Sequence, residues 1–169
     1  MAEGARAERI LVAAGGAGEE GRGAMFERIL VPLDLSDESL EVLERALAVA
    51  AGAAEVSLLH VVERLADDEA ELEVFYRRLS ERARAGLDRF AARVAASGRR
   101  AHSEVVVGRR IEEILAAAER FGADLLVVGS RPLARDGSPR DGLTLGLRVA
   151  LQAPCAVLLV RTPRSVAPR

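Results

Sequence analysis

The fold is decided by Ala123-Asp-Leu-Leu-Val-Val-Gly-Ser-Arg131. The run from Leu125 to Val128 is continuously apolar, too short for a helix, and stops at Gly129-Ser130. Such a run predicts a strand buried on both faces, as strands of parallel sheets are. The glycine that ends it allows the backbone to approach a ligand closely.

A helix is expected after this strand, beyond a polar loop. Asp141-Gly-Leu-Thr-Leu-Gly146 opens the helix, and Ala153-Pro-Cys-Ala-Val-Leu-Leu-Val160 supplies a further apolar run. Because the first turn of a helix has N–H groups without an intrahelical partner, the strand, the glycine and the helix together form a place for an anion. The alternative is that Gly129 and Gly142 only close a strand and open a helix.

The rest of the chain repeats this alternation of strand and helix. We expect strands at 28–34, 55–62, 101–107, 125–128 and 155–160, and helices at about 37–51, 67–97, 109–120 and 142–152. The connections are long enough to cross over, which implies parallel strands with helices on both faces. The predicted fold is therefore α/β, a single doubly wound domain with a five-stranded parallel sheet.

Two helices carry clear apolar patterns. In the first, Ser36 is the expected N-cap, and the inward face is expected to hold Leu40, Leu43, Leu47 and Ala50. The second is longer than one sheet requires, so we expect it to overhang the sheet or to break near Gly86. Its aromatic residues are predicted to anchor the core, among them Phe75, Tyr76 and Phe90.

Composition excludes several function classes. The chain has 169 residues, a formal charge of −2, and 24 basic residues that are all arginine, so lysine-dependent phosphate loops and Schiff bases are excluded. The balanced charge does not favour nucleic acid or membrane as a partner. The single Cys155 excludes an internal disulfide and is expected to pack as a small apolar residue, and His60 is expected to pack in or at the end of a strand rather than bind metal. No apolar run is long enough for a membrane helix, and we expect a cytoplasmic protein.

The ends of the chain are expected to lie outside the domain at 25–162. Residues 1–24 are rich in glycine and alanine and are predicted to be a flexible extension, and residues 163–169 a C-terminal tail. However, Glu8-Arg-Ile-Leu-Val12 repeats Glu27-Arg-Ile-Leu-Val31. The alternative is therefore that the extension forms a short extra strand.

Four motifs in order resemble the universal stress protein family. They are Phe26-Glu-Arg-Ile-Leu-Val-Pro-Leu-Asp34, Ser57-Leu-Leu-His-Val-Val62, Gly122-Ala-Asp-Leu-Leu-Val-Val-Gly-Ser-Arg131 and Ala153-Pro-Cys-Ala-Val-Leu-Leu-Val160. The resemblance implies the strand order 3-2-1-4-5, which places the first and fourth strands side by side. Ligands bind at the carboxyl ends of such strands.

The resemblance also implies a site for an adenine nucleotide. ATP-binding members carry Gly, two residues, Gly, nine residues, then Gly with Ser or Thr. Here the spacing is kept, but Pro132 replaces the middle glycine and Leu143 the hydroxyl residue, which removes a backbone and a side-chain donor. Asp34 is implied to contact adenosine, the alternative being a loop aspartate that caps the next helix. The nucleotide-binding residues implied are Pro32, Leu33, Asp34, Val61, Gly129, Ser130, Arg131, Gly142, Leu143 and Thr144, and the cofactor is ATP with Mg²⁺.

The function implied is non-catalytic ATP or AMP binding or sensing in a stress response, since no catalytic set of residues is present. One alternative is a dimeric interaction or scaffold protein of the same fold that binds no nucleotide; a second is a weak ATP hydrolase. Family members commonly pair through the last strand, so a homodimer is expected through an uncovered edge formed by Ala156, Val157, Leu158, Leu159 and Val160.

Overall fold

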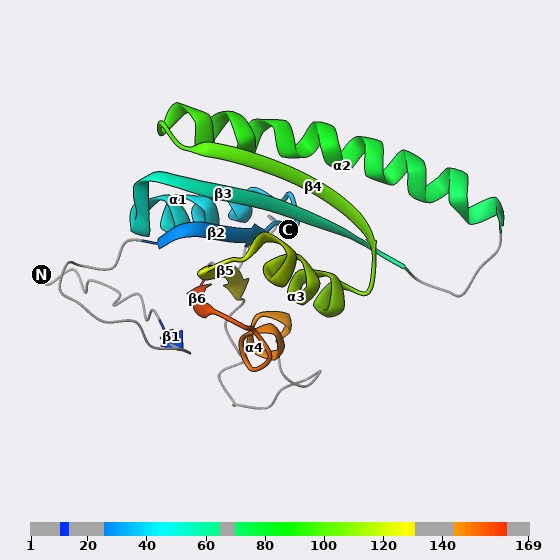
Figure 1. Ribbon diagram of the computed structural model, residues 1–169. Helices are drawn as coiled ribbons and strands as arrows, with labels where there is room; N and C mark the ends of the chain where they lie inside the picture. Colours follow the sequence, from blue (N-terminus) through cyan, green and yellow to red (C-terminus); the bar gives the residue numbers. More distant parts are fainter. Residues whose placement is uncertain (1–10, 14–25, 65–69, 131–143, 162–169) are drawn as a thin grey trace, which may run out of the picture.

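The computed structural model describes residues 11–13, 26–64, 70–130 and 144–161. Strands and helices alternate along most of this length, as Figure 1 shows. In chain order the elements are β1 (Leu11–Ala13), β2 (Phe26–Pro32), α1 (Glu38–Val49), β3 (Ala50–Glu63), α2 (Ala70–Ala96), β4 (Arg100–Gly108), α3 (Arg110–Phe121), β5 (Leu125–Ser130), α4 (Leu145–Ala150) and β6 (Ala156–Arg161).

The sheet confirms the predicted topology. Its order is β1-β6-β5-β2-β3-β4, and the five strands from β2 to β6 pair in parallel. In order of appearance these five strands are arranged 3-2-1-4-5. β2 and β5 are neighbours, with Ile29 opposite Leu125 and Leu30 opposite Leu126. The carboxyl ends of these two strands therefore lie side by side at the switch point.

The outer edge of β6 is paired by β1 of the same chain. The two strands are antiparallel, with Leu11 opposite Leu159 and Ala13 opposite Val157. This corrects the expectation of an uncovered edge, and it gives the extension the extra strand that its repeated sequence suggested. The apolar side chains of β6 fill the core of this chain, since Val157, Leu158, Leu159 and Val160 are each at most 8% exposed.

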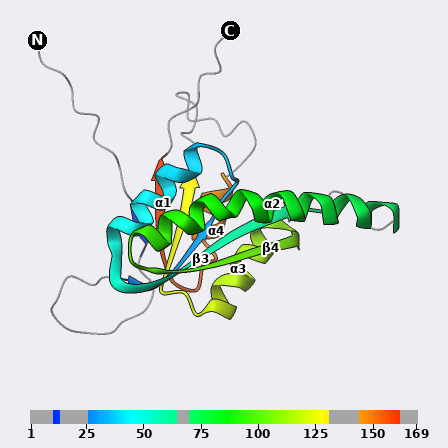
Figure 2. The ribbon, with the colours of Figure 1, turned by 90° about the horizontal axis from the view of Figure 1, so that it is seen from above.

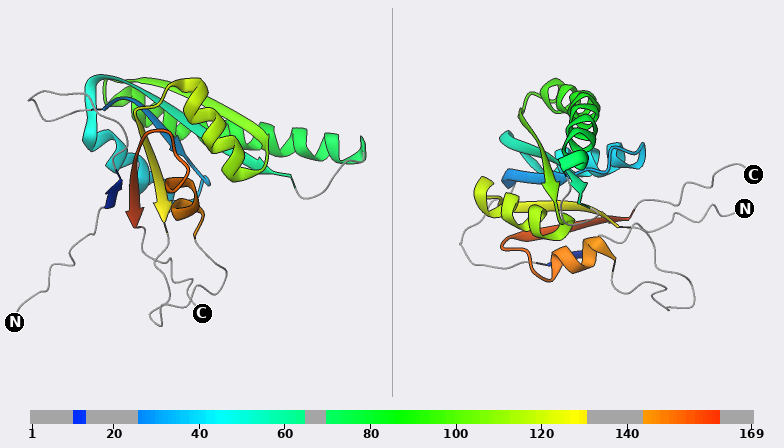
Figure 3. Two further views of the ribbon diagram at one scale, coloured as in Figure 1. Left: turned by 60° about the horizontal axis from the view of Figure 1, so that its bottom comes forward. Right: turned by 90° about the vertical axis from the view of Figure 1, so that its right-hand side faces the viewer.

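The sheet separates two apolar layers, and Figure 3 shows helices on both of its faces. One layer packs α1 and α2 against the sheet through residues such as Leu43, Leu87 and Phe90. The other packs α3 and α4 through Ile114 and Val149. Alternate residues of each strand supply the two layers, which explains why the strands read as continuous apolar runs.

Helix α2 is continuous through Gly86 and extends past the sheet, as seen from above in Figure 2. The predicted overhang is therefore present and the predicted break is absent. Phe75, near the start of α2, is 47% exposed and Tyr76 is only half-buried, so these aromatic residues do not anchor the core as predicted; Phe90 does. Although α2 has 27 residues, neither it nor any other helix in the described ranges is apolar enough to cross a membrane.

Two expectations for α1 are also wrong. Leu40 is 47% exposed, whereas its neighbour Ser39 is buried, because the inward face begins with Ser39, Val42 and Leu43. Ser36 does not cap the helix with its side chain, and its hydroxyl donates to Asp34 instead.

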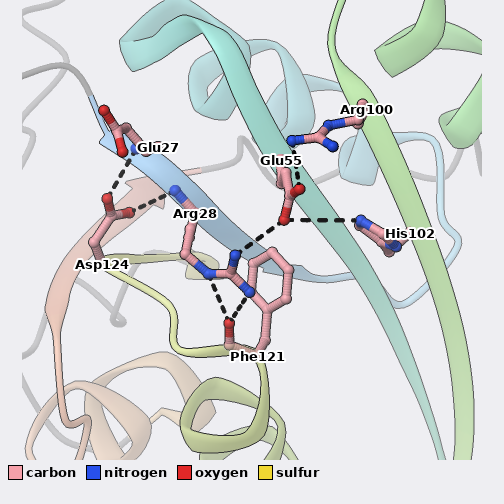
Figure 4. A network of polar contacts seen from close by, with 7 residues as sticks. All are labelled: Glu27, Arg28, Glu55, Arg100, His102, Phe121 and Asp124. Atoms are coloured by element: carbon pink, nitrogen blue, oxygen red, sulfur yellow. Dashed lines mark hydrogen bonds and ion pairs between the residues drawn. The ribbon is translucent and has the colours of Figure 1, made fainter.

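The amino ends of the strands are joined by a polar network, shown in Figure 4. Glu55 of β3 pairs with Arg28 of β2 at 3.1 Å and with Arg100 of β4 at 2.6 Å. The Arg28 guanidinium donates to the Phe121 carbonyl oxygen and lies 4.4 Å from the centre of the Phe121 ring. Asp124 accepts from the backbone N–H of Glu27 and Arg28. The network ties β2, β3, β4 and the end of α3 together at the edge opposite the switch point.

Candidate functional site

A cavity of about 360 Å³ lies at the carboxyl ends of the central strands. Its walls come from the ends of β2, β3 and β5 and from the first turns of α1, α3 and α4. This is the position that the topology predicts for a ligand. Seven of the predicted site residues line it: Pro32, Leu33, Asp34, Val61, Gly129, Ser130 and Thr144.

Asp34 stands at the β2 end of the cavity. Its Oδ1 accepts from the backbone N–H of Ser36 at 3.1 Å and from the hydroxyls of Ser36 and Ser39, both at 2.6 Å. These bonds fix the carboxylate and join the loop to α1. The residue thus has the local bonding expected of a loop aspartate, and it also lies in the cavity wall.

His60 also lines the cavity, and it contacts the residue before Asp34, because β3 is the neighbour of β2. Its Nδ1 is 2.8 Å from the Leu33 carbonyl oxygen, which only accepts, so Nδ1 carries the hydrogen. In the neutral ring Nε2 is then the acceptor. Sequence reasoning assigned His60 a packing role only. His60 directly precedes Val61, which was assigned to the nucleotide site from the sequence. This adjacency is the signal that could have placed His60 there as well.

At the β5 end the backbone and α4 approach closely. A Cβ added to Gly146 would lie 3.2 Å from the Gly129 carbonyl oxygen and 3.1 Å from Leu159 Cδ2. Thr144 is the N-cap of α4, and its Oγ1 accepts from the Leu147 N–H at 3.4 Å. The helix thus begins at Leu145, three residues later than predicted, and Thr144 places a hydroxyl at its start.

Charge is unevenly distributed around the described part of the cavity. Asp34 and Glu38 contribute carboxylates near the end of β2, and Arg110 contributes a guanidinium from the start of α3. Arg110 is itself paired with Glu63 at 2.9 Å. Polar groups at the β5 end are neutral, namely Ser130 and Thr144. A ligand with a hydrogen-bond-donating end and an anionic end is therefore expected to place the donors near Asp34.

Four residues of the predicted phosphate motif lie outside the described residues: Arg131, Pro132, Gly142 and Leu143. The described ranges contain no group of three or more His, Cys, Asp or Glu side chains that could hold a metal ion. Cys155 is half-buried near the amino end of β6. Burial and, secondarily, the charge of Asp124 raise the pKa of its thiol above the ordinary value, which suits a packing residue rather than a nucleophile.

The strand order and the position of the cavity define a doubly wound α/β protein with a cavity at its switch point, where ligands of such sheets bind. The chain belongs to the universal stress protein family, whose model matches residues 25–161. This confirms the resemblance drawn from the four motifs.

The chain is similar to two universal stress proteins over most of its length. A universal stress protein of Methanocaldococcus jannaschii is 30% identical over 146 residues, which cover 83% of this chain and 85% of the relative. A universal stress protein of Thermus aquaticus, encoded in the 3′ region of a QAH/OAS sulfhydrylase gene, is 37% identical over 145 residues, which cover 81% of this chain and 100% of the relative.

Solved structures share the fold. Hypothetical protein MJ0577 superposes with a TM-score of 0.67 and 26% identity, covering 84% of this chain and 100% of that one. A universal stress protein solved in complex with cAMP gives a TM-score of 0.62 at 24% identity and covers 81% of this chain and 98% of that one. The second likeness concerns the fold alone.

Proposed function

We propose that this universal stress protein binds an adenine nucleotide, ATP or AMP, in the cavity at the switch point and acts as a non-catalytic sensor. The observation that carries the proposal is that one cavity brings together residues from distant parts of the chain: Asp34, just after β2, Gly129 and Ser130 of β5, and Thr144, the N-cap of α4. These residues are about 100 positions apart in the sequence. The cavity volume of about 360 Å³ is within the range of small-molecule sites.

The charges favour one orientation of the nucleotide. Adenosine carries its donors on the amino group and the ribose hydroxyls, and a carboxylate such as Asp34 accepts from either. Phosphates are repelled by Asp34 and Glu38 and are accommodated at the β5 end, where Ser130 and Thr144 supply hydroxyls. Val61 provides an apolar contact for the base. Arg131, Gly142 and Leu143 are included in the proposed phosphate-binding set on the sequence motif alone, and the proposed ligand is ATP with Mg²⁺.

The architecture and its switch point support the proposal. A protein with the same architecture has been solved with cAMP, a related nucleotide, and the switch point is where ligands of doubly wound sheets bind. The proposal includes a cytoplasmic location.

A thermal melt in the presence of nucleotide tests the proposal. Full-length protein is heated with and without ATP and Mg²⁺, and separately with AMP, at concentrations well above the expected Kd. A ligand at 100 times its Kd stabilises the native state by about 2.7 kcal/mol, which raises Tm by several degrees. Asp34→Ala should lose the shift, whereas Ser39→Ala, which removes one partner of Asp34 but keeps the carboxylate, should retain most of it.

Equal melting temperatures with and without nucleotide would contradict the proposal. Phosphate release measured in the same samples tests the alternative of weak hydrolysis.

A dimeric scaffold that uses Ala156–Val160 is a less supported proposal, because β1 pairs with β6 and the β6 side chains are buried in their own chain.

A further inference from the structure

The loop that carries Asp34 contains an unfavourable backbone conformation. Leu35 has a φ of +64°, and it is the sole non-glycine residue with a positive φ among those the structure describes. A left-handed conformation is unfavourable for a residue with a Cβ. Such a conformation persists only where surrounding contacts hold it. The contacts around Leu35 should therefore show what keeps this loop in place.

One contact is made by Gly86, in the interior of α2. A Cβ added there would lie 3.0 Å from Leu35 Cδ1 and 3.8 Å from Leu35 Cγ. The Leu35 side chain therefore rests on a helix surface that a larger residue would fill. Glycine inside a helix is less favourable than alanine, and here the missing side chain leaves the space that the Leu35 side chain occupies.

A second contact is made by Arg89, on the same face of α2 as Gly86. Its Nη2 donates to the carbonyl oxygen of Leu35 at 2.7 Å and to that of Ser36 at 3.3 Å. Its Nη1 lies 3.6 Å from a carboxylate oxygen of Asp37. The guanidinium thus binds three consecutive residues of the loop. Two of those partners are backbone carbonyls, so the contact depends on the path of the loop and not only on its sequence.

We propose that Gly86 and Arg89 are positioning residues for the nucleotide site. Together they hold Leu35 in its left-handed conformation, which turns the Leu35 side chain toward α2 and leaves Asp34 in the cavity wall. The three hydrogen bonds accepted by Asp34 Oδ1 secure the loop from within, and α2 secures it from outside. The expected effect on nucleotide affinity rests on the proposed function. The contacts of Gly86 and Arg89 with the loop, called the clamp below, are present without nucleotide.

Hydrogen exchange tests the clamp without nucleotide. The Ser36 amide is bonded to Asp34 Oδ1, so its exchange reports the integrity of the loop. Arg89→Met removes the donors and keeps an apolar stem; it should speed exchange of Ser36 about tenfold or more while the Val127 amide in β5 is unchanged. Arg84→Met, at an exposed arginine of the same helix, is the matched control and should leave Ser36 exchange as in the wild type. Gly86→Val, which fills the seat of Leu35, should act like Arg89→Met.

Nucleotide titrations then test the consequence for the site. Arg89→Met should raise the Kd for ATP about tenfold, and Arg84→Met should not. In an Asp34→Asn background the effect of Arg89→Met should largely disappear, because Arg89 acts through the position of Asp34; general destabilisation would instead add. If ATP binds neither the wild type nor any variant, the proposed function fails. The exchange experiment still shows whether Gly86 and Arg89 hold the loop. Unchanged Ser36 exchange in both Arg89→Met and Gly86→Val would overturn the inference.

Discussion

Removing the Asp34 carboxylate should destabilise the protein even without a ligand. Three hydrogen bonds to Asp34 Oδ1 disappear in Asp34→Ala, two from the partly exposed Ser36 and one from Ser39. Ser39 is 4% exposed, so its hydroxyl is left without its acceptor in a buried position. An unsatisfied buried group costs about 1 to 3 kcal/mol, and the two bonds nearer the surface add roughly 0.5 kcal/mol each. The expected loss is about 2 to 4 kcal/mol.

Urea denaturation followed by far-UV circular dichroism measures this loss. Because Ser39→Ala removes the buried hydroxyl together with its need for a partner, it should cost only about 1 kcal/mol, although it breaks one of the same bonds. The comparison separates the unsatisfied hydroxyl from the loss of a contact. A free energy of unfolding for Asp34→Ala within about 0.5 kcal/mol of the wild type would refute the reasoning that these bonds hold the loop.

Three further predictions concern other parts of the molecule. Cys155 should react more slowly with a thiol reagent than free cysteine at pH 8, because its pKa is raised by burial and by Asp124. The unfolded thiol ionises first, so the wild type should lose stability faster than Cys155→Ala as pH rises past the ordinary thiol pKa. Glu55→Gln should lower the free energy of unfolding by about 1 to 2 kcal/mol, since Glu55 is mostly buried and its arginine partners are more exposed. Leu11→Pro with Val12→Pro removes two of the three backbone N–H groups of β1 and should uncover the edge of β6, so sedimentation should show more self-association than in the wild type.

Each of these predictions has a contradicting result. Equal alkaline slopes for the wild type and Cys155→Ala would exclude the raised thiol pKa. A Glu55→Gln variant as stable as the wild type would show that the network in Figure 4 is energetically neutral. The strand-preserving pair Leu11→Val and Val12→Ile is the control for β1, and identical sedimentation of the proline variant and this control would show that β1 does not limit self-association.

The sequence predicts the sheet well because buried parallel strands leave a strong pattern. The apolar run from Leu125 to Val128 predicts a buried strand, and the strand order that the family resemblance implies puts β2 and β5 at a shared switch point. Asp34 and Gly129 are therefore expected at the same edge of the sheet. The strands that carry the cavity residues were predicted from the same apolar pattern.

The errors occur where tertiary context, not local pattern, decides burial. Phe75 continues the apolar stripe of α2, yet it is 47% exposed, because α2 extends past the strands that the structure describes. Leu40 fits the spacing of the inward face of α1, but Ser39 is the residue turned inward, toward Asp34.

The pairing of β1 with β6 and the backbone conformation of Leu35 could not be predicted from the sequence either. The repeat at residues 8–12 suggested a strand, but nothing in it specified β6 as its partner. The left-handed conformation of Leu35 has no sequence signal either, because glycine or asparagine is the usual choice there. The proposed contribution of α2 to the site rests on the contacts of Gly86 and Arg89, which no sequence pattern indicates.

Nucleotide binding at the switch point is tested most directly by a titration of the ¹⁵N-labelled protein with ATP and Mg²⁺, followed by amide chemical shifts. Binding in the cavity should give saturable shifts at Asp34, Val61, Ser130 and Thr144, with no change at Arg28 or His102 on the opposite edge of the sheet. Shifts that fail to saturate, or that gather around Arg28 and His102 while the cavity residues stay unmoved, would contradict it.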